Sequence, residues 1–156
     1  MSDLPHGSSH ATLSHADGAA ASAADAALLV GRVLIGWLFL SAGWAKLMNI
    51  AGFVTYLTNL KVPNPAFWAW IAAPAEVLIG ITLILGLATR YACLFTVLYL
   101  VIATALAHRY WEYPAAAQQN QYNHFVKNLA IMGGALFLFV TGGGRFSLDR
   151  MLAKKG

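Results

Sequence analysis

The sequence predicts an all-α membrane protein, a four-helix transmembrane bundle with a short interfacial helix between the first and second spans. Of its 156 residues, 59% are hydrophobic and only 10% are charged, whereas about 25% of the residues of a typical soluble domain are charged. The apolar residues also gather in four runs, each close to the roughly 20 residues that a helix needs to cross a bilayer. Four spans and their loops use nearly the whole chain, which leaves no room for a separate catalytic domain.

The first 25 residues differ from the rest of the chain. They are rich in Ala, Ser, Gly and His and show no apolar periodicity, as is typical of a segment that cannot build a packed core. They contain three aspartates and no Lys or Arg, whereas a secretory signal begins with a basic region. We therefore expect a disordered tail over residues 1–27 and a first apolar run that is retained as a membrane anchor.

Four apolar runs predict the spans, and aromatic residues at their ends are typical of an interfacial belt. The expected spans are Leu28–Leu47, Phe67–Leu87, Tyr91–Ala107 and Phe125–Thr141. Only residues 88–90 separate the second span from the third, so these two are expected to be antiparallel neighbours. After the first span, Phe53, Leu57 and Leu60 recur at helical spacing among polar residues, which favours a short helix in the membrane interface.

Four spans place both termini on one side of the membrane, and the basic residues indicate which side. The termini side carries Arg32, Arg90, Arg145, Arg150, Lys154 and Lys155, and the other side carries Lys46, Lys61, Arg109 and Lys127. This distribution favours cytoplasmic termini. The net charge of +4 therefore reflects topology and contact with anionic lipids rather than nucleic-acid binding. We expect a membrane domain over residues 28–149 and a basic cytoplasmic tail over residues 150–156.

Glu76 is the sharpest candidate for a functional side chain, because it falls near the middle of the second span. An acidic residue at that depth costs roughly 2.5 to 3.5 kcal/mol, so it should be protonated or paired with a cation. The candidate partners are Arg32, Lys46 and Lys127, the nearest of them about 10 Å away in depth by helix arithmetic. The residues fit both a structural ion pair that fixes helix register and a carboxylate that handles protons or a ligand.

The histidines and the cysteine are weaker candidates. His108 and His124 fall at the outer ends of the third and fourth spans with Glu112 between them, so the bundle could bring these three side chains together. Their spacing matches no metal motif; two interfacial histidines explain them as well, and no metal is expected. Cys93 is the only cysteine, which excludes an intrachain disulfide, a CxxC redox pair and a thiolate zinc site.

Several short motifs resemble those of the DoxX family of small membrane proteins, in the same order along the chain. The segment RVLIGWLFLSAGWAKL is similar to the family's opening motif, at Arg32, Gly36, Phe39, Gly43, Lys46 and Leu47. The segment PAEVLIGITLILGLATRYA resembles its glutamate helix and Thr-Arg turn, at Glu76, Gly80, Gly86, Thr89 and Arg90. The segments ATALAH and FVKNLAIMGGALFLFVTGGGRFSLD resemble its third and fourth helices, at His108, Lys127, Asn128, Gly133, Gly134, Arg145 and Asp149.

The resemblance covers about residues 28–149 and implies a multi-pass protein of the bacterial inner membrane. Some relatives are linked to quinone-dependent thiosulfate oxidation, others to membrane complexes with partners in oxidative or thiol stress, and distant ones to cargo transport. The resemblance thus implies a redox role, with a quinone supplied by the membrane or by a partner. The buried polar or ligand-binding candidates are Arg32, Lys46, Glu76, Lys127 and Asn128.

Two classes of function follow. In the first, the chain is a membrane subunit of a quinone-linked oxidoreductase, and a polar pocket around Glu76, Arg32, Lys46 and Lys127 holds a quinone head or relays a proton. One cysteine and no paired histidines within a span mean that any electron carrier must come from a partner protein. In the second, the chain is a non-enzymatic scaffold or small-solute carrier whose buried charges organise the bundle. The partners considered are the lipid bilayer, a redox protein and a second copy of the chain.

Overall fold

The computed structural model describes residues 8–154, and these residues are helical apart from short connections. The elements are α1 (Ser8–Met48), α2 (Ile50–Asn59), α3 (Pro65–Leu85), α4 (Thr89–Ala107), the 3-10 helix η1 (Tyr110–Glu112), α5 (Ala115–Thr141) and α6 (Leu148–Ala153). Four of them, α1, α3, α4 and α5, are long and apolar enough to cross a membrane. The predicted fold class is confirmed, including the short helix between the first two spans.

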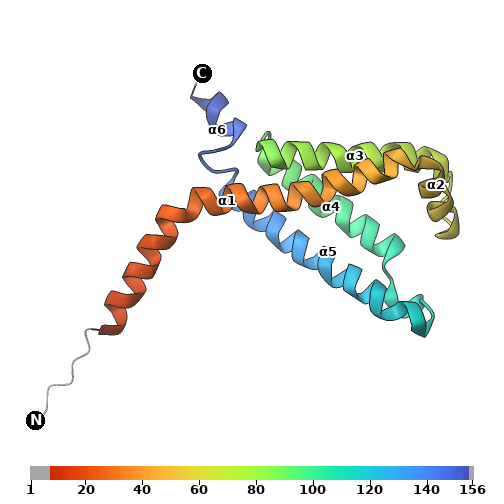
Figure 1. Ribbon diagram of the computed structural model, residues 1–156, viewed down its shortest axis with the longest axis horizontal. Coiled ribbons are helices and arrows are strands. Elements are labelled where there is room, and N and C mark those ends of the chain that lie inside the picture. The colour runs from red at the N-terminus through yellow and green to blue at the C-terminus, as the bar shows by residue number, and fades with distance from the viewer. Residues whose placement is uncertain (1–7, 155–156) are drawn as a thin grey trace, which may run out of the picture.

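The four long helices form two pairs. Helix α1 packs along α3, and α4 packs along α5, while Figure 1 shows the two pairs close together near α6 and diverging toward α2 and η1. The contact between α3 and α4 is smaller. The tight turn therefore makes α3 and α4 antiparallel, as expected, but α1 is the main partner of α3.

Small residues bring α1 and α3 into backbone contact. A Cβ atom added at Gly80 would lie 2.6 Å from the amide nitrogen of Leu40 and 2.7 Å from the carbonyl oxygen of Gly36. A Cβ atom added at Gly43 would lie 2.7 Å from the amide nitrogen of Val77. Such close approach without side chains between the backbones is the usual way in which membrane helices gain packing energy. Gly36 and Gly43 therefore lie on the face of α1 that packs against α3.

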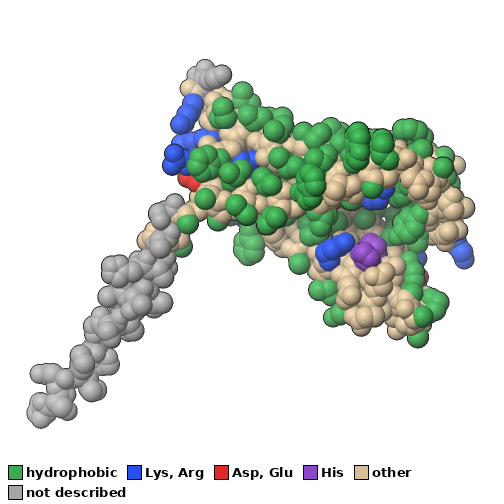
Figure 2. Space-filling view, viewed as in Figure 1, with side chains coloured by type: hydrophobic (Ala, Val, Ile, Leu, Met, Phe, Trp, Pro, Cys, Tyr) green, Lys and Arg blue, Asp and Glu red, His purple; other side chains and the backbone are tan. Residues whose placement is uncertain are grey.

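The surface of the long helices is apolar. Many large hydrophobic side chains are exposed, including Trp37 on α1, Tyr91 on α4 and Phe137 on α5, and Figure 2 shows apolar side chains over much of one face. A soluble monomer rarely exposes so much apolar surface. The Lys and Arg side chains in this view gather mainly near α6 (Figure 2). An apolar belt with basic groups at the helix ends is the surface that a bilayer requires.

Two helix boundaries differ from the sequence-based expectations. Helix α1 begins at Ser8, so residues 8–27 are helical where a disordered tail was expected, and residues 1–7 of that tail lie outside the described part. Helix α5 begins at Ala115, ten residues before the expected fourth span at Phe125. Both additions are rich in Ala, and the second in Gln, which are good helix formers without an apolar stripe. Hydropathy therefore located the apolar part of each helix but not the residue at which the helix begins.

The C-terminal segment also differs from the prediction of a simple basic tail. Residues 148–153 form the short helix α6, whose first turn is capped by Ser147: its hydroxyl oxygen accepts a hydrogen bond from the amide of Arg150. Such a cap satisfies an amide that the helix itself leaves free. Helix α6 lies beside the α3–α4 turn, where the amide of Asp149 donates a hydrogen bond to the carbonyl oxygen of Gly86 at 3.0 Å, and it adds side chains to a site described below.

Candidate functional site

The most unusual polar group within the bundle is a buried carboxylate with two donors. Glu76, near the centre of α3, is 5% exposed, and Lys46 of α1 donates hydrogen bonds to both of its carboxylate oxygens. The hydroxyl of Tyr99, from α4, donates to Oε1 at 2.5 Å. Three helices thus meet at one carboxylate, and the attraction between opposite charges is strong where water is excluded.

Close packing of α1 on α3 explains how Lys46 reaches Glu76. Gly43 lies against Glu76, since a Cβ atom added at Gly43 would come within 2.8 Å of the Glu76 Cβ. Lys46 follows three residues later, only about 4.5 Å further along the helix. The depth of about 10 Å expected from the sequence was too large, because it placed each helix separately in the bilayer. Among the three predicted partner cations, the structure pairs Lys46 with Glu76.

The members of this site differ in how far their side chains are exposed. The side chain of Glu76 is 7% exposed, whereas that of Lys46 is 29% exposed. Tyr99 is partly buried, with its ring edge-on to Phe39 at a centroid distance of 6.2 Å. Lys46 is therefore more accessible from outside the bundle than Glu76.

Arg32 occupies a separate site at the other end of α1. Its guanidinium donates to the carbonyl oxygens of Ile84 at 2.6 Å and Leu83 at 3.4 Å, and to that of Phe146. These carbonyls lie at the end of α3 and before α6, so Arg32 ties three segments together. It is 1% exposed and lies about 21 Å along the helix from Lys46. The single polar pocket expected around Arg32, Lys46, Glu76 and Lys127 is therefore divided.

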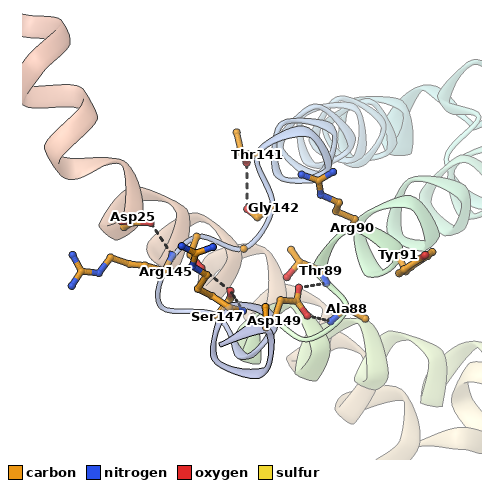
Figure 3. Close-up of a pocket in the computed structure, with 14 residues that line it drawn as sticks. Asp25, Ala88, Thr89, Arg90, Tyr91, Thr141, Gly142, Arg145, Ser147 and Asp149 are labelled. Carbon is orange, nitrogen blue, oxygen red and sulfur yellow. Dashed lines mark hydrogen bonds between the residues drawn. The ribbon is translucent and has the colours of Figure 1, made fainter. Parts of the chain in front are cut away.

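Asp149 completes the site around Arg32. Its carboxylate accepts hydrogen bonds from the amides of Ala88 at 2.6 Å and Thr89 at 2.8 Å (Figure 3). These are the first amides of α4, where the helix dipole favours a negative charge. Burial works against ionisation of Asp149, but the amide hydrogen bonds and the nearby Arg32 outweigh it and lower the pKa of its carboxyl. The C-terminal segment is thus fastened to the α3–α4 turn by charge-assisted hydrogen bonds.

The other predicted site residues lie in the N-terminal half of α5 or at the end of α4, which is next to it. Asn128 is buried and donates to the hydroxyl of Thr104 on α4 at 2.9 Å. Lys127 is exposed, with its ammonium 3.2 Å from Nδ1 of His124. The rings of His108 and His124 are stacked, with centroids 5.0 Å apart. Asn128 joins α4 to α5, and the cation paired with Glu76 is Lys46 rather than Lys127.

The side chains of His108, Glu112 and His124, which the sequence analysis considered together, do not converge on one point. Glu112 pairs with Arg109 at 3.2 Å rather than with the stacked histidines, and Nδ1 of His108 is 2.8 Å from the side-chain oxygen of Gln121. Within residues 8–154, no group of three His, Cys, Asp or Glu side chains is arranged to hold a metal ion. The two histidines are stacked at the end of the α4–α5 pair where η1 joins the helices.

Tyr99 and Asp149 were not recognised as site residues from the sequence. Tyr99 lies within an apolar run, where a tyrosine hydroxyl needs a partner once it is buried, and that requirement was the available signal. Asp149 lies in a polar segment, 60 residues from Thr89 along the chain, and only the fold brings the two into hydrogen-bond contact.

Comparison with known proteins gives consistent matches over most of the chain. The DoxX family model matches residues 27–109. The inner membrane protein YphA of Escherichia coli is 34% identical over 123 residues, which cover 79% of this chain and 88% of YphA. The inner membrane protein YqjF of the same organism is 35% identical over 131 residues, 84% of this chain and 95% of YqjF.

A more distant relative is the uncharacterized membrane protein Rv3486 of Mycobacterium tuberculosis, which is 29% identical over 139 residues and is covered to 80% of its length. No solved structure matches the chain.

Proposed function

This chain belongs to the DoxX family of integral membrane proteins, and from that premise we propose that it is a membrane subunit of a quinone-linked redox system. The observation that carries the proposal is the triad of Glu76, Lys46 and Tyr99, which places two hydrogen-bond donors and a carboxylate within the bundle. Buried ionisable groups in a membrane span are costly and usually serve transport or proton transfer.

The donor set fits the head of a quinone. Lys46 has three ammonium hydrogens and donates two of them to Glu76, so the third can be donated to a carbonyl oxygen. Tyr99 donates its one hydroxyl hydrogen to Glu76 and so helps to hold the carboxylate in place. A bound quinone would supply reversible two-electron chemistry coupled to protons, with the electrons delivered by a partner protein. Lys46 would orient a carbonyl oxygen, and Glu76 would accept or return the proton. Partial exposure of Lys46 allows a ligand to approach it without unfolding the bundle.

The divergence of the helix pairs offers a route to this site. The α1–α3 and α4–α5 pairs separate toward α2 (Figure 1), and Figure 2 shows the surface hollowed between them, with His and basic side chains at its edge. Lys46 lies in the last turn of α1, next to α2. We place the protein in the bacterial inner membrane, like YphA and YqjF, where a quinone pool is available from the lipid side.

Purification in a mild detergent tests the proposal. Organic extraction and mass spectrometry of the wild-type protein should reveal bound quinone, and proteomics of the same sample should reveal a redox protein that purifies with it. The variant Lys46→Met should lose most of the quinone while Gly133→Ala, on an open helix face, should keep it. Equal and negligible quinone in all three samples, with no redox partner, would refute the proposal.

A second candidate function is a non-enzymatic scaffold or small-solute carrier. Two observations favour it. Both carboxylate oxygens of Glu76 already accept hydrogen bonds, and the ion pair between Lys46 and Glu76 joins α1 to α3. A pair of this kind can fix helix register without taking part in chemistry. Under this alternative, Glu76→Gln would reduce stability while leaving any partner bound by the remaining folded protein.

A further inference from the structure

A pocket lies at the end of the bundle where α4 begins and α5 ends, apart from the Glu76 site. It has a volume of about 620 Å³ and lies among the turn before α4, the Gly142–Gly144 loop after α5, and helix α6. Figure 3 shows Arg90, Arg145, Ser147 and Asp149 around it. Three arginines, Arg90, Arg145 and Arg150, and two aspartates, Asp25 and Asp149, line this pocket.

The two aspartates are already engaged by backbone amides. Asp149 accepts hydrogen bonds from the amides of Ala88 and Thr89, and Asp25 accepts one from the amide of Arg145 at 2.8 Å. Each carboxylate therefore serves to hold the wall of the pocket together. Neither lies within ion-pair distance of a pocket arginine, since the salt bridges among the described residues are those of Lys46 and Arg109.

The guanidinium groups of the three pocket arginines make few contacts with the rest of the protein. Arg90 makes one long hydrogen bond, 3.3 Å to the carbonyl oxygen of Val140, and points toward the Gly142 loop in Figure 3. Arg145 lies over the ring of Phe146 at 5.1 Å. Arg150 is exposed. The pocket thus has an excess of positive charge and donors in a fixed fork geometry, which suits the oxygens of a phosphate group.

A buried hydroxyl supplies an independent observation. Thr89 is 1% exposed and lines the pocket. Its Oγ1 lies near the Asp149 carboxylate but makes no hydrogen bond of normal geometry within residues 8–154. An unpartnered buried hydroxyl is costly and calls for a partner from outside the chain. Gly143 of the loop packs against this hydroxyl, because a Cβ atom built there would lie 2.7 Å from Thr89 Oγ1. The open space lies beside Gly142, where the nearest atom to an added Cβ is the Arg90 Nε at 3.8 Å.

We propose that this pocket binds the phosphate of an anionic membrane phospholipid. The site lies where α3 and α5 end and α4 begins, at the level of the headgroups. The exposed Tyr91 lines it, and the exposed Phe146 and Leu152 are next in sequence to lining residues. These side chains can contact the acyl chains of a lipid, whereas a soluble phosphate compound would have no use for them. Basic pockets at such helix ends are known to hold lipid headgroups. The inference stands independently of the quinone proposal.

Native mass spectrometry of the full-length protein tests it. Protein from nanodiscs of mixed phosphatidylglycerol and phosphatidylcholine should retain phosphatidylglycerol preferentially after partial delipidation. The double variant Arg90→Gln/Arg150→Gln should bind it at least about tenfold more weakly, since each basic residue near an anionic headgroup contributes about fivefold. The matched control, Lys61→Gln/Arg109→Gln, removes two exposed cations from the other end of the bundle and should bind like the wild type.

Arg150→Gln alone provides a second variant, because its guanidinium has no ion pair among the described residues and its loss should not impair folding. A several-fold loss of phosphatidylglycerol is expected for this variant at an unchanged melting temperature. Unchanged binding in both pocket variants, or an equal loss in the control, would overturn the proposal. Displacement of the bound phosphatidylglycerol by millimolar glycerol phosphate would show that the pocket takes soluble phosphate esters and would overturn the lipid assignment.

Discussion

Glu76 is surrounded by apolar residues of three helices, and its charge is balanced by Lys46 and stabilised by the Tyr99 hydroxyl. Removal of one member of such a pair leaves the other charge buried and unpaired, which costs more than the pair itself contributes. The energetic behaviour of this pair therefore depends on both residues together, and single substitutions at either position will overstate its net contribution.

A double-mutant cycle measures that dependence. Lys46→Met should lower the free energy of unfolding by about 3 kcal/mol, and Glu76→Gln in the same background should recover part of the loss. The coupling energy, from denaturation in detergent micelles, should exceed about 0.5 kcal/mol, the scale on which independent sites add. The exposed pair Arg109 and Glu112 serves as the control and should give about 0.5 kcal/mol or less. Strict additivity at Lys46 and Glu76 would show that they do not interact.

Asp149 predicts a pH dependence at the other end of the molecule. Its lowered pKa means that the ionised form is favoured by folding, so its contribution is present above the ordinary pKa of an aspartate. That contribution is lost as the pH falls through the lower pKa of the folded protein. Thermal melting between pH 7 and about pH 3 should show an acid-induced decrease that is smaller in Asp149→Asn. The exposed Glu112→Gln should keep the wild-type profile, and an unchanged profile in Asp149→Asn would contradict the capping role.

At the residue scale the sequence identified Glu76, because a carboxylate within an apolar run is conspicuous. The sequence did not show which cation pairs with Glu76. Depths estimated for isolated helices do not include the relative shift of α1 and α3 along their axes. Tyr99 became a site residue only through the packing of α4 on the α1–α3 pair. Arg32 was recognised as a buried cation, but its carbonyl partners Ile84 and Phe146 carry no sequence signal of their own.

Helices α1 and α3 owe their close contact to glycines, and this predicts a specific sensitivity. Gly80→Ala would place a Cβ atom 2.6 Å from a backbone nitrogen, which neither helix can relieve without moving apart, so we expect a loss of about 1–3 kcal/mol in unfolding free energy. Gly133→Ala is the matched control, because a Cβ atom there meets nothing within 4 Å. The control should be neutral or slightly stabilising, as Ala favours helix over Gly by up to about 1 kcal/mol. Equal melting temperatures for the two variants would contradict the packing.

The helices themselves were largely predictable, since each span shows as an apolar run bounded by Pro, Gly or aromatic residues. The starts of α1 and α5 were not, because Ala and Gln extend a helix without adding hydropathy. The short helix α6 was missed for a similar reason: its six residues carry no periodic signal, and its position depends on Ser147 and Asp149.

The orientation of the whole bundle is predicted by its basic residues. In a Cys93→Ala background, a cysteine introduced by Gln119→Cys should react with a membrane-impermeant maleimide in intact cells. Gln119 lies in the first turns of α5, which the predicted topology places outside the cell. A cysteine introduced by Lys154→Cys should react only after the cells are permeabilised. The reverse labelling pattern would overturn the assignment of cytoplasmic termini.

The arrangement of the helices could not be derived from the sequence alone. A short turn made α3 and α4 antiparallel, but shape complementarity between small residues decided that α1 and α3 form the tighter pair. The two pairs diverge toward the end of α1 that carries Lys46, while the arginine pocket lies at the other end of the bundle. The predicted single polar pocket was wrong because Arg32 and Lys46 lie near opposite ends of the α1 span.

Titration of the purified, lipid-stripped protein with a short-tailed benzoquinone, followed by tryptophan fluorescence, tests the proposed role of the Glu76 site most directly. We expect saturable quenching in the wild type and in Gly133→Ala. Lys46→Met and Glu76→Gln should bind at least about tenfold more weakly, the effect of losing one hydrogen bond to a charged group. Indistinguishable titrations for all four folded proteins would contradict the assignment of Glu76, Lys46 and Tyr99 as the quinone site.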